Sequence, residues 1–288
     1  MKWWKGSRAL LLPAFIFLLL IAGYGFWQAF YRSIGGQDGI TFEYYKYILY
    51  SPEWVSSLIY SLSITFISTC LSLIIGLVMT KSFAPYLFQT WGKLLVWLPM
   101  LFPHFVGGYL VFFFFSQSGL LSHVAYVVGI IEERSQFPVL VQDQWGIGVI
   151  LTYVWKEVPF VILMLLPVYS TLNPQFREEV QLLGGGKFHI FRTAEWPWVL
   201  PVLLEVGLIL FSFILTAFEV PFLLGVTYPK MVSVLAYDWF YSGEWSDRPL
   251  AFASLTLLAV CVGAVAFILF TIIQRKRWLV AHGKRRGV

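Results

Sequence analysis

Six long apolar stretches divide this sequence, and they constrain its fold more than any other feature. Each is as long as the roughly 20 residues that an α-helix needs to cross a bilayer. None alternates between polar and apolar residues as the strands of a membrane barrel do. The sequence therefore predicts an all-α integral membrane protein with six transmembrane helices, at 9–31, 55–80, 94–115, 145–169, 198–224 and 249–274.

The composition agrees with this interpretation. Hydrophobic residues make up 59% of the chain and charged residues only 12%, whereas a soluble domain carries about 25% charged residues. The mean hydropathy is +0.76. Cys70 and Cys261 each lie inside an apolar stretch with no Cys or His at ligand spacing. We therefore expect small core residues there and no zinc or redox site.

The first apolar stretch follows a basic start and could also be read as a secretory signal peptide. The apolar region of a signal peptide is about 7–15 residues long and precedes a small-residue cleavage site. This stretch is longer, and it ends in the aromatic run Gly25-Phe26-Trp27-Gln28-Ala29-Phe30-Tyr31. We expect an uncleaved transmembrane helix.

Basic residues are distributed unevenly between the segments that flank the stretches. With the N-terminus inside, 14 of the 20 Lys and Arg residues fall in cytoplasmic segments, five in external segments and Lys156 within a span. Positive residues collect on the cytoplasmic side of membrane proteins. Both termini are thus expected in the cytoplasm of a multi-pass bacterial inner-membrane protein. This topology also explains the net charge of +5 without a nucleic acid partner.

Two features complicate the third span. Pro99 and Pro103 lie inside it, and proline removes a helical hydrogen bond. The apolar segment that follows, 119–131, is short for a span. We expect this segment to be an interfacial or re-entrant part of the loop after the third helix.

The segment 172–197 carries the main functional signal. Pro174 is suited to the first turn of a helix, and the helix dipole favours Glu178 and Glu179 near that start. Glycines at 184–186 then stop the helix and permit a positive φ. A second short amphipathic helix follows before the next span.

Each of these short helices is expected to have an apolar face. Phe176, Val180 and Leu183 are spaced four and three residues apart, and Phe188 and Phe191 lie on one face of the second helix. An apolar stripe on a cytoplasmic helix needs a surface to bury against. Long structured loops are often functional.

This loop resembles the EAA motif of binding-protein-dependent ABC permeases with the type I importer fold. That motif begins with a Glu and two small residues. Three variable residues follow, then a Gly and an Ala, and a Leu-Pro comes thirteen residues past the Gly. Here Glu178 takes the place of the Glu, and Gly184 and Gly185 take those of the Gly and Ala. Phe191 falls on the usual Phe and Pro197 on the Pro. The spacing Glu178–Gly184–Pro197 is the specific part.

The sequence departs from the motif at three positions. Glu179 and Val180 stand where the two alanines are usual, and Trp196 stands for the Leu. The spacing is intact. The resemblance implies that the loop forms the coupling helix that docks on an ATPase subunit, with Gly184 as the principal coupling residue.

Other segments extend the resemblance over most of the chain. They indicate three parts: an N-terminal helix with its external loop (1–54), a type I permease core (55–274) and a basic cytoplasmic tail (275–288). The similarity is greatest to permeases for polyamines, sulfate, molybdate, thiamine, phosphonates or iron(III). The resembling segments are 61–76, 99–104, 155–160 and 218–225.

The resemblance also implies partners. These are two ABC ATPase subunits that hold ATP and Mg, a second permease (identical or paralogous) and an extracytoplasmic substrate-binding protein, all assembled on the lipid bilayer. This chain itself is expected to bind no cofactor. Its run Gly184–Lys187 is not a phosphate-binding loop, because Gln181 stands where the first Gly is needed and Phe188 follows the Lys.

Ionisable residues inside spans are candidates for the translocation pathway, because burying them in a bilayer costs about 2.5–3.5 kcal/mol each. Lys156 and Glu157 lie in the fourth span, His104 in the third and Glu219 toward the outer end of the fifth. Neighbouring helix residues point about 100° apart, so Lys156 and Glu157 are expected to have different partners. For both, a buried contact between helices is an equal alternative to a pathway role.

Two other classes of function were weighed. A stand-alone secondary transporter or channel would need inverted repeats and its own ion-coupling site, and no convincing repeat is present. A membrane enzyme would need convergent catalytic residues, and the sequence shows no catalytic set and no metal-ligand cluster. We therefore expect a non-catalytic permease subunit.

Overall fold

The computed structural model describes residues 3–36, 39–172 and 174–282, most of which are helical. The chain divides into two compact units. The first contains the residues up to 57 together with 232–261, and the second contains 58–231 together with the residues from 262 onward. Two long helices, α3 (Pro52–Leu87) and α13 (Arg248–His282), contribute residues to both units.

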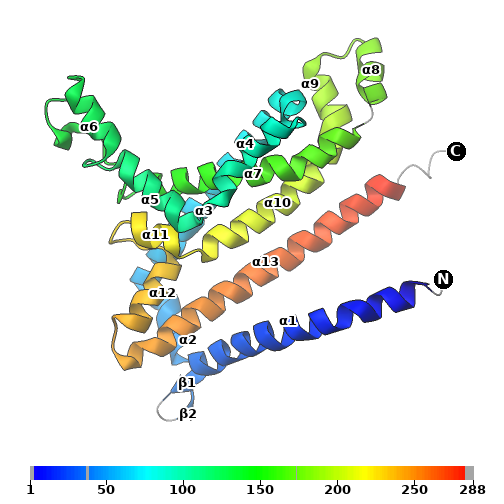
Figure 1. The fold of residues 1–288 in the computed structure, drawn as a ribbon. Helices are drawn as coiled ribbons and strands as arrows, with labels where there is room; N and C mark the ends of the chain where they lie inside the picture. The colour runs from blue at the N-terminus through cyan, green and yellow to red at the C-terminus, as the bar shows by residue number, and fades with distance from the viewer. Residues whose placement is uncertain (1–2, 37–38, 173, 283–288) are drawn as a thin grey trace. The chain divides into compact units, whose positions relative to one another are not determined.

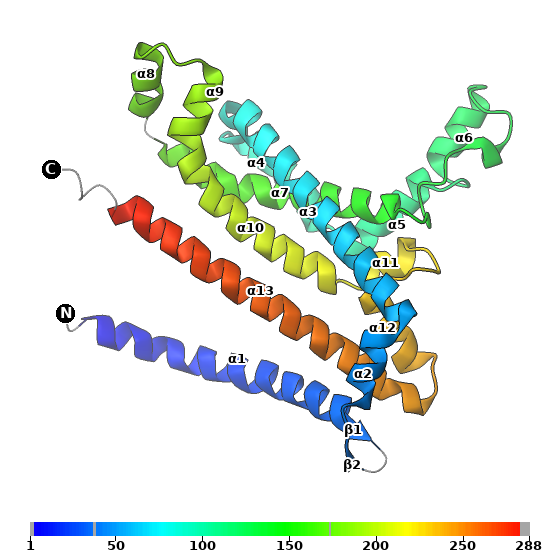
Figure 2. The same cartoon turned by 180° about the vertical axis from the view of Figure 1, so that it is seen from behind.

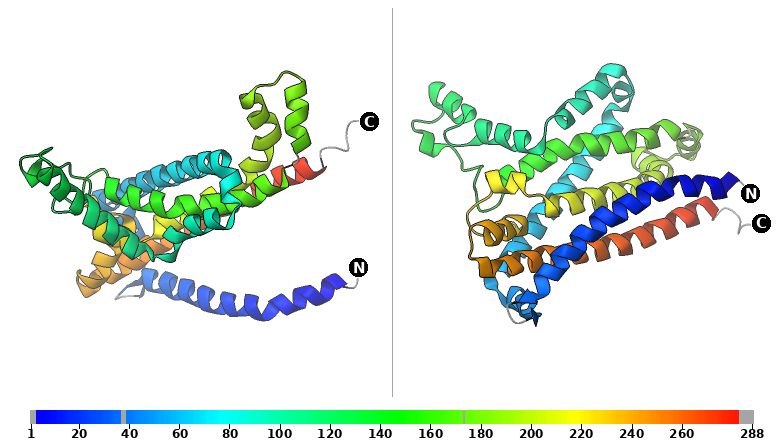
Figure 3. Two further views of the ribbon diagram at one scale, coloured as in Figure 1. Left: turned by 45° about the horizontal axis from the view of Figure 1, so that its top comes forward. Right: turned by 60° about the horizontal axis from the view of Figure 1, so that its bottom comes forward.

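The first unit begins with α1 (Trp3–Ile34), which ends in a short hairpin (Figure 3). In this hairpin β1 (Gly35–Gly36) pairs antiparallel with β2 (Gly39–Ile40). Inside the unit the buried Trp54 indole N–H donates to Ser254 Oγ at 2.7 Å. The remaining elements are α2 (Glu43–Tyr50), α12 (Val232–Tyr241), η3 (Trp245–Asp247) and the start of α13.

Helix α7 (Ile147–Thr171) is the centre of the second unit. In the most apolar part of α7, 61% of the residues are buried, a larger share than in the other five apolar helices of the described chain. Helices α4 (Thr90–Leu101), α5 (His104–Phe115), α10 (Trp196–Thr216) and α11 (Glu219–Leu224) all pack on it. The other elements are α6 (Leu120–Val127), η1 (Arg134–Gln136), α8 (Pro174–Leu182), α9 (Lys187–Ile190) and η2 (Phe191–Glu195).

The core of this unit is formed mainly by α7 and α10. Val161 and Leu165 of α7 and Val206 and Ile214 of α10 are fully buried within one apolar cluster. Helix α3 crosses over α7 (Figure 2) at Gly76, where an added Cβ would lie 2.5 Å from Val161 Cγ1. Glycine is needed at this crossing because the helices approach so closely.

Six stretches in the described part of the chain are long and apolar enough to cross a membrane: Leu11–Ile34, Pro52–Leu87, His104–Val127, Ile147–Thr171, Lys187–Thr216 and Trp245–Thr271. The predicted number of spans and their helical character are therefore confirmed. The bounds differ by a few residues in the other spans, and the third and fifth spans are broken differently from the prediction.

The third span is broken at Pro103 and not at Pro99. Pro99 stays inside α4, whereas Phe102 is extended (φ −86°, ψ 136°) and α5 begins at His104. Proline disfavours a helical conformation in the residue before it. The apolar stretch that starts afresh at His104 also takes in α6, which the sequence analysis placed outside the spans.

The fifth span ends earlier than predicted. Helix α10 stops at Thr216, Ala217 is extended (φ −68°, ψ 141°), and α11 begins at Glu219. Pro221 has no N–H to donate to the Ala217 carbonyl, so a continuous helix would lack one bond here. The predicted single helix 198–224 is therefore wrong in its last eight residues, which contain a break and a separate short helix.

Candidate functional site

The segment 172–197 forms a structured loop beyond the ends of α7 and α10 (Figure 1). As predicted, two short helices, α8 and α9, lie on either side of the glycines. One detail differs, because α9 is not separate from the next span. It continues through the π-helical turn η2 into α10, and Pro197 lies in the first turn of α10.

The glycines end α8 in a defined way. Gly184 has a φ of +78°; its N–H bonds to Gln181 O at 2.9 Å, and the Gly185 N–H bonds to Val180 O at 2.8 Å. This pair of bonds is the Schellman arrangement, in which a left-handed residue satisfies the last helical carbonyls. The glycines therefore form a specific helix cap and not only a flexible joint.

The two motif glycines are needed for different reasons. At Gly184 an added Cβ would meet nothing within 4 Å, so only its positive φ favours glycine. At Gly185 an added Cβ would lie 2.6 Å from Val180 Cγ1 and 2.8 Å from Val180 O. Gly186 has neither constraint, since its φ is −75° and the space around it is open.

Large apolar side chains around this cap face outward. Leu182 is 87% exposed, Leu183 is 88% exposed and Phe188 is 69% exposed. Of the predicted stripe, Phe176 and Val180 are half-buried while Leu183 is open. Contiguous exposed apolar side chains mark interaction sites. We name Leu182, Leu183 and Phe188 the apolar tip of the loop.

A buried carboxylate ties the loop to two spans. Glu195, at the end of η2, is 3.0 Å from Arg177 of α8 and 3.3 Å from Lys81 of α3. Its side chain is 5% exposed, whereas those of Lys81 and Arg177 are 40% and 46% exposed. A buried carboxylate is stable only when paired. The ion network thus joins α8, α3 and the start of α10.

Phe191 supports the same junction. The Lys81 ammonium lies 4.1 Å from the centre of its ring, and the Trp196 ring lies 5.5 Å away. A cation over an aromatic face is attracted by the ring quadrupole. The predicted motif residue Phe191 therefore holds the side chain that reaches Glu195.

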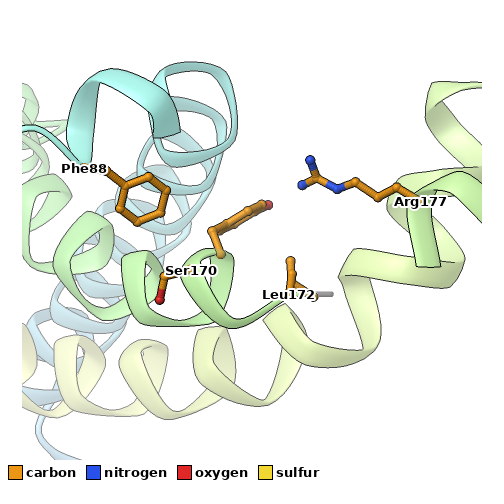
Figure 4. A pocket seen from close by; sticks show the side chains of 5 residues that line it. Phe88, Ser170, Leu172 and Arg177 are labelled. Atoms are coloured by element: carbon orange, nitrogen blue, oxygen red, sulfur yellow. The ribbon is translucent and has the colours of Figure 1, made fainter. Parts of the chain in front are cut away.

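A pocket of about 400 Å³ adjoins this network (Figure 4). Arg177 of α8 and Phe88, at the end of α3, lie on opposite sides of it, with Ser170 and Leu172 below. Tyr169 completes the lining. The pocket lies between α8 and the ends of α3 and α7, and the ion network connects α8 to α3 beside it.

The remaining motif residues lie on the surface of the loop. Glu178 and Glu179 are exposed on α8, and Pro197 is exposed at the start of α10. The structure thus brings Gly184 and Gly185 into the helix cap, and leaves both glutamates open to a partner.

The predicted pathway residues separate into two groups. Lys156 and Glu157 are buried and have different partners, as predicted: Lys156 donates to backbone carbonyls of α4, and Glu157 is 2.8 Å from His104 Nε2 of α5. Glu219 is exposed in the first turn of α11. These contacts agree with the alternative of buried contacts between helices, and a pathway role stays a prediction.

The Glu195 network is not among the features predicted from the sequence. One signal was present, because Glu195 immediately precedes Trp196-Pro197 and a long apolar stretch. A carboxylate at a membrane boundary needs a cation nearby. Within the described residues no three His, Cys, Asp or Glu side chains are grouped to hold a metal ion.

Comparisons with known proteins agree on one class. No family model matches the sequence. The sulfate transport system permease protein CysT of Salmonella typhimurium is 24% identical over 227 residues, which cover 78% of this chain and 77% of that protein. Further curated relatives are also described as permease proteins of transport systems.

Solved structures show the same fold. One is a bacterial ABC transporter involved in the import of the acidic polysaccharide alginate, with a TM-score of 0.71, 20% identity, and 96% of this chain and 99% of that chain covered. A second holds the alginate transporter in complex with a periplasmic protein bound to an alginate pentasaccharide, with a TM-score of 0.66, 19% identity, and coverage of 100% and 98%.

These relatives are transport permeases and these neighbours are ABC importers, so the resemblance read from the loop is confirmed. The chain is a multi-pass membrane protein that resembles ABC transporter permeases, and it has the fold of the type I importer permeases.

Proposed function

We propose that this chain is the permease subunit of an ATP-driven importer and forms half of a translocation pathway for a small solute. The loop 172–197 couples it to a separate ATPase, which holds the ATP and Mg. The alginate ABC transporter of this fold forms a complex with a periplasmic protein that holds an alginate pentasaccharide, and an external binding protein is the expected source of the solute here. A second permease, identical or paralogous, completes the pathway.

The apolar tip of the loop is the observation that carries this proposal. Leu182, Leu183 and Phe188 are open, yet the helix that presents two of them is capped at Gly184 and tied down by Glu195. A fixed apolar surface of this kind suits burial against another protein. The spacing Glu178–Gly184–Pro197 matches the EAA motif, and that resemblance implies that the docking partner is an ABC ATPase.

The ion network gives a route for the coupling. When the ATPase moves α8, Arg177 pulls on Glu195 at the start of α10, and Lys81 links the same carboxylate to α3. Two spans therefore move with one loop. Alternating access of the pathway to the two sides of the membrane follows from this displacement.

The proposed topology places the loop and both termini in the cytoplasm of a bacterial inner membrane. The excess of Lys and Arg on that side supports it. Within the second unit, α6 and the α8–α9 loop lie at opposite ends (Figure 1), so the loop after α5 faces outward. Glu219, exposed at the start of α11, is the candidate for the external part of the pathway.

The test is detergent co-purification of the chain with the ATP-binding subunit of its own cell. Wild type is compared with a Glu178→Lys, Gly184→Val variant. The matched control is Glu132→Lys, Gly129→Val, because Glu132 is also exposed and Gly129 has a φ of +79° with open space around it. We expect the ATPase with wild type and control only.

Two outcomes contradict the proposal. If neither wild type nor control retains an ATPase, the chain works alone, as a secondary transporter or channel would. If the loop variant retains the ATPase as well as wild type does, the docking site lies elsewhere on the chain.

A further inference from the structure

The break between α4 and α5 leaves backbone groups without helical partners. A continuous helix would join the N–H of residue 103 to the carbonyl of Pro99, but Pro103 has no N–H. Phe102 is extended, so its carbonyl also leaves the helical pattern. The membrane interior has no water to bond such carbonyls, so a side-chain donor that reaches them stabilises the break.

Lys156 supplies the missing donor. Its Nζ donates to Pro99 O and to Phe102 O, and the residue is buried. Both carbonyls are among those that lose a helical donor at the end of α4. The ammonium also lies at the C-terminal end of α4, where the helix dipole favours a positive charge.

Glu157 contacts the other side of the break. Its Oε1 is 2.8 Å from Nε2 of His104, the first residue of α5. A carboxylate near a helix N-terminus is favoured by the dipole. The His104 ring also lies 4.8 Å from the Phe213 ring of α10. Consecutive residues of α7 therefore hold the end of one half-helix and the start of the next.

We infer that Lys156 and Glu157 are positioning residues that clamp the helix break at Phe102–Pro103. Close packing supports the clamp, since an added Cβ on Gly107 of α5 would lie 3.2 Å from Lys156 Cδ. The clamp itself does not depend on the proposed function. Its consequence does: if the chain is a permease, the clamp fixes the angle at which α5 leaves α4 beside the pathway.

The test is a thermal double-mutant cycle on the purified chain. Lys156→Met in the wild-type background orphans both carbonyls and lowers the Tm by about 4–8 °C. In a Pro103→Ala background, the helix regains a backbone N–H donor for Pro99 O. Lys156 is then a buried cation that these carbonyls no longer need as a donor. There, Lys156→Met leaves the Tm unchanged or raises it.

Pro99→Ala is the matched control. It restores an N–H whose helical acceptor is Leu95 O, so Pro99 O stays unpaired. Lys156→Met should therefore be as harmful with Pro99→Ala as in wild type. Lys156→Arg, which keeps the charge and the donors, should retain the wild-type Tm.

A distance measurement tests positioning separately from stability. Spin labels replace Leu95 of α4 and Tyr109 of α5, which are 71% and 54% exposed, with Cys70 and Cys261 changed to Ala. Lys156→Met should broaden their distance distribution, and Lys156→Arg should not. An unchanged distribution in Lys156→Met overturns the inference.

An equal loss of Tm from Lys156→Met in the wild-type and Pro103→Ala backgrounds also overturns it. If Lys156→Met alone does not fold, the two double variants decide: with Pro103→Ala it should fold, and with Pro99→Ala it should not. None of these readouts needs an ATPase, so their failure and the failure of the proposed function are distinguishable.

Discussion

Glu195 illustrates how one buried charge shapes the candidate site. Its carboxylate is almost fully buried, and its two partners reach it from α3 and α8 while remaining half open to solvent. Removing the partners of a buried ion is costly, whereas exposed cations that lose a partner are hydrated instead. The three residues are therefore unequal in their effect on stability.

We predict a matching asymmetry in unfolding. Lys81→Gln with Arg177→Gln leaves the buried carboxylate without a cation and should destabilise by about 3 kcal/mol, or roughly 6–12 °C in Tm. Glu195→Gln should cost about 1 kcal/mol. The triple variant should resemble Glu195→Gln, as thermal unfolding in detergent would show. Equal losses from Glu195→Gln and the double variant would refute this reading.

Gly184 allows a second prediction for a single residue. A side chain at its positive φ costs about 1 kcal/mol, so Gly184→Ser should open the end of α8 about fivefold more often. Hydrogen exchange of the amides in 176–186 measures this. Gly186→Ser is the control, because its φ is −75° and serine is a good N-cap for α9; faster exchange in both variants would contradict the role of φ.

Among the elements, the crossing of α3 over α7 depends on the absence of a side chain at Gly76. Gly76→Ala would place a methyl group 2.5–2.6 Å from Val161 Cγ1 and Cβ. We predict a loss of about 1–3 kcal/mol in stability. Val161→Gly removes both clashing atoms, so Gly76→Ala should cost less in a Val161→Gly background than in wild type.

Gly263 of α13 provides the comparison for this experiment. An added Cβ there meets nothing within 4 Å, and alanine is a better helix former than glycine. Gly263→Ala should therefore leave the Tm unchanged or raise it slightly. A similar loss of Tm from Gly76→Ala and Gly263→Ala would show that the close crossing is not the cause.

The elements also show what the sequence can and cannot predict. Hydropathy alone predicted six helical spans, because span length is fixed by bilayer thickness. It did not tell Pro99, which stays within α4, from Pro103, which ends the helical path. Lys156, which donates to Pro99 O and Phe102 O, comes from a distant part of the sequence, and no local pattern pairs it with the break.

The local parts of the candidate site could be predicted from the sequence, but its contacts between spans could not. Pro174 and the glycines at 184–186 are local signals, and they correctly placed α8, its cap and α9. The Glu195 network was missed because Lys81 belongs to another span, and no local pattern pairs these residues. The roles of Glu178 and Gly184 in docking stay predictions.

For the whole molecule, the proposed function has one loop join the membrane helices to a soluble ATPase. The fold is that of importer permeases, and the apolar tip is the exposed part of the loop best suited to a protein contact. Leu183 and Trp145 are matched in exposure, at 88% and 80%. They flank the two ends of α7 and, on the proposed topology, face opposite sides of the membrane.

Site-specific photo-crosslinking in intact cells shows whether the loop docks on an ATPase. A benzophenone amino acid replaces Leu183 in one variant and Trp145 in the other, and the crosslinked partners are identified by mass spectrometry. We predict an adduct between position 183 and an ABC ATPase, and none with that ATPase from position 145. An ATPase adduct from position 145, or none from position 183, would contradict it.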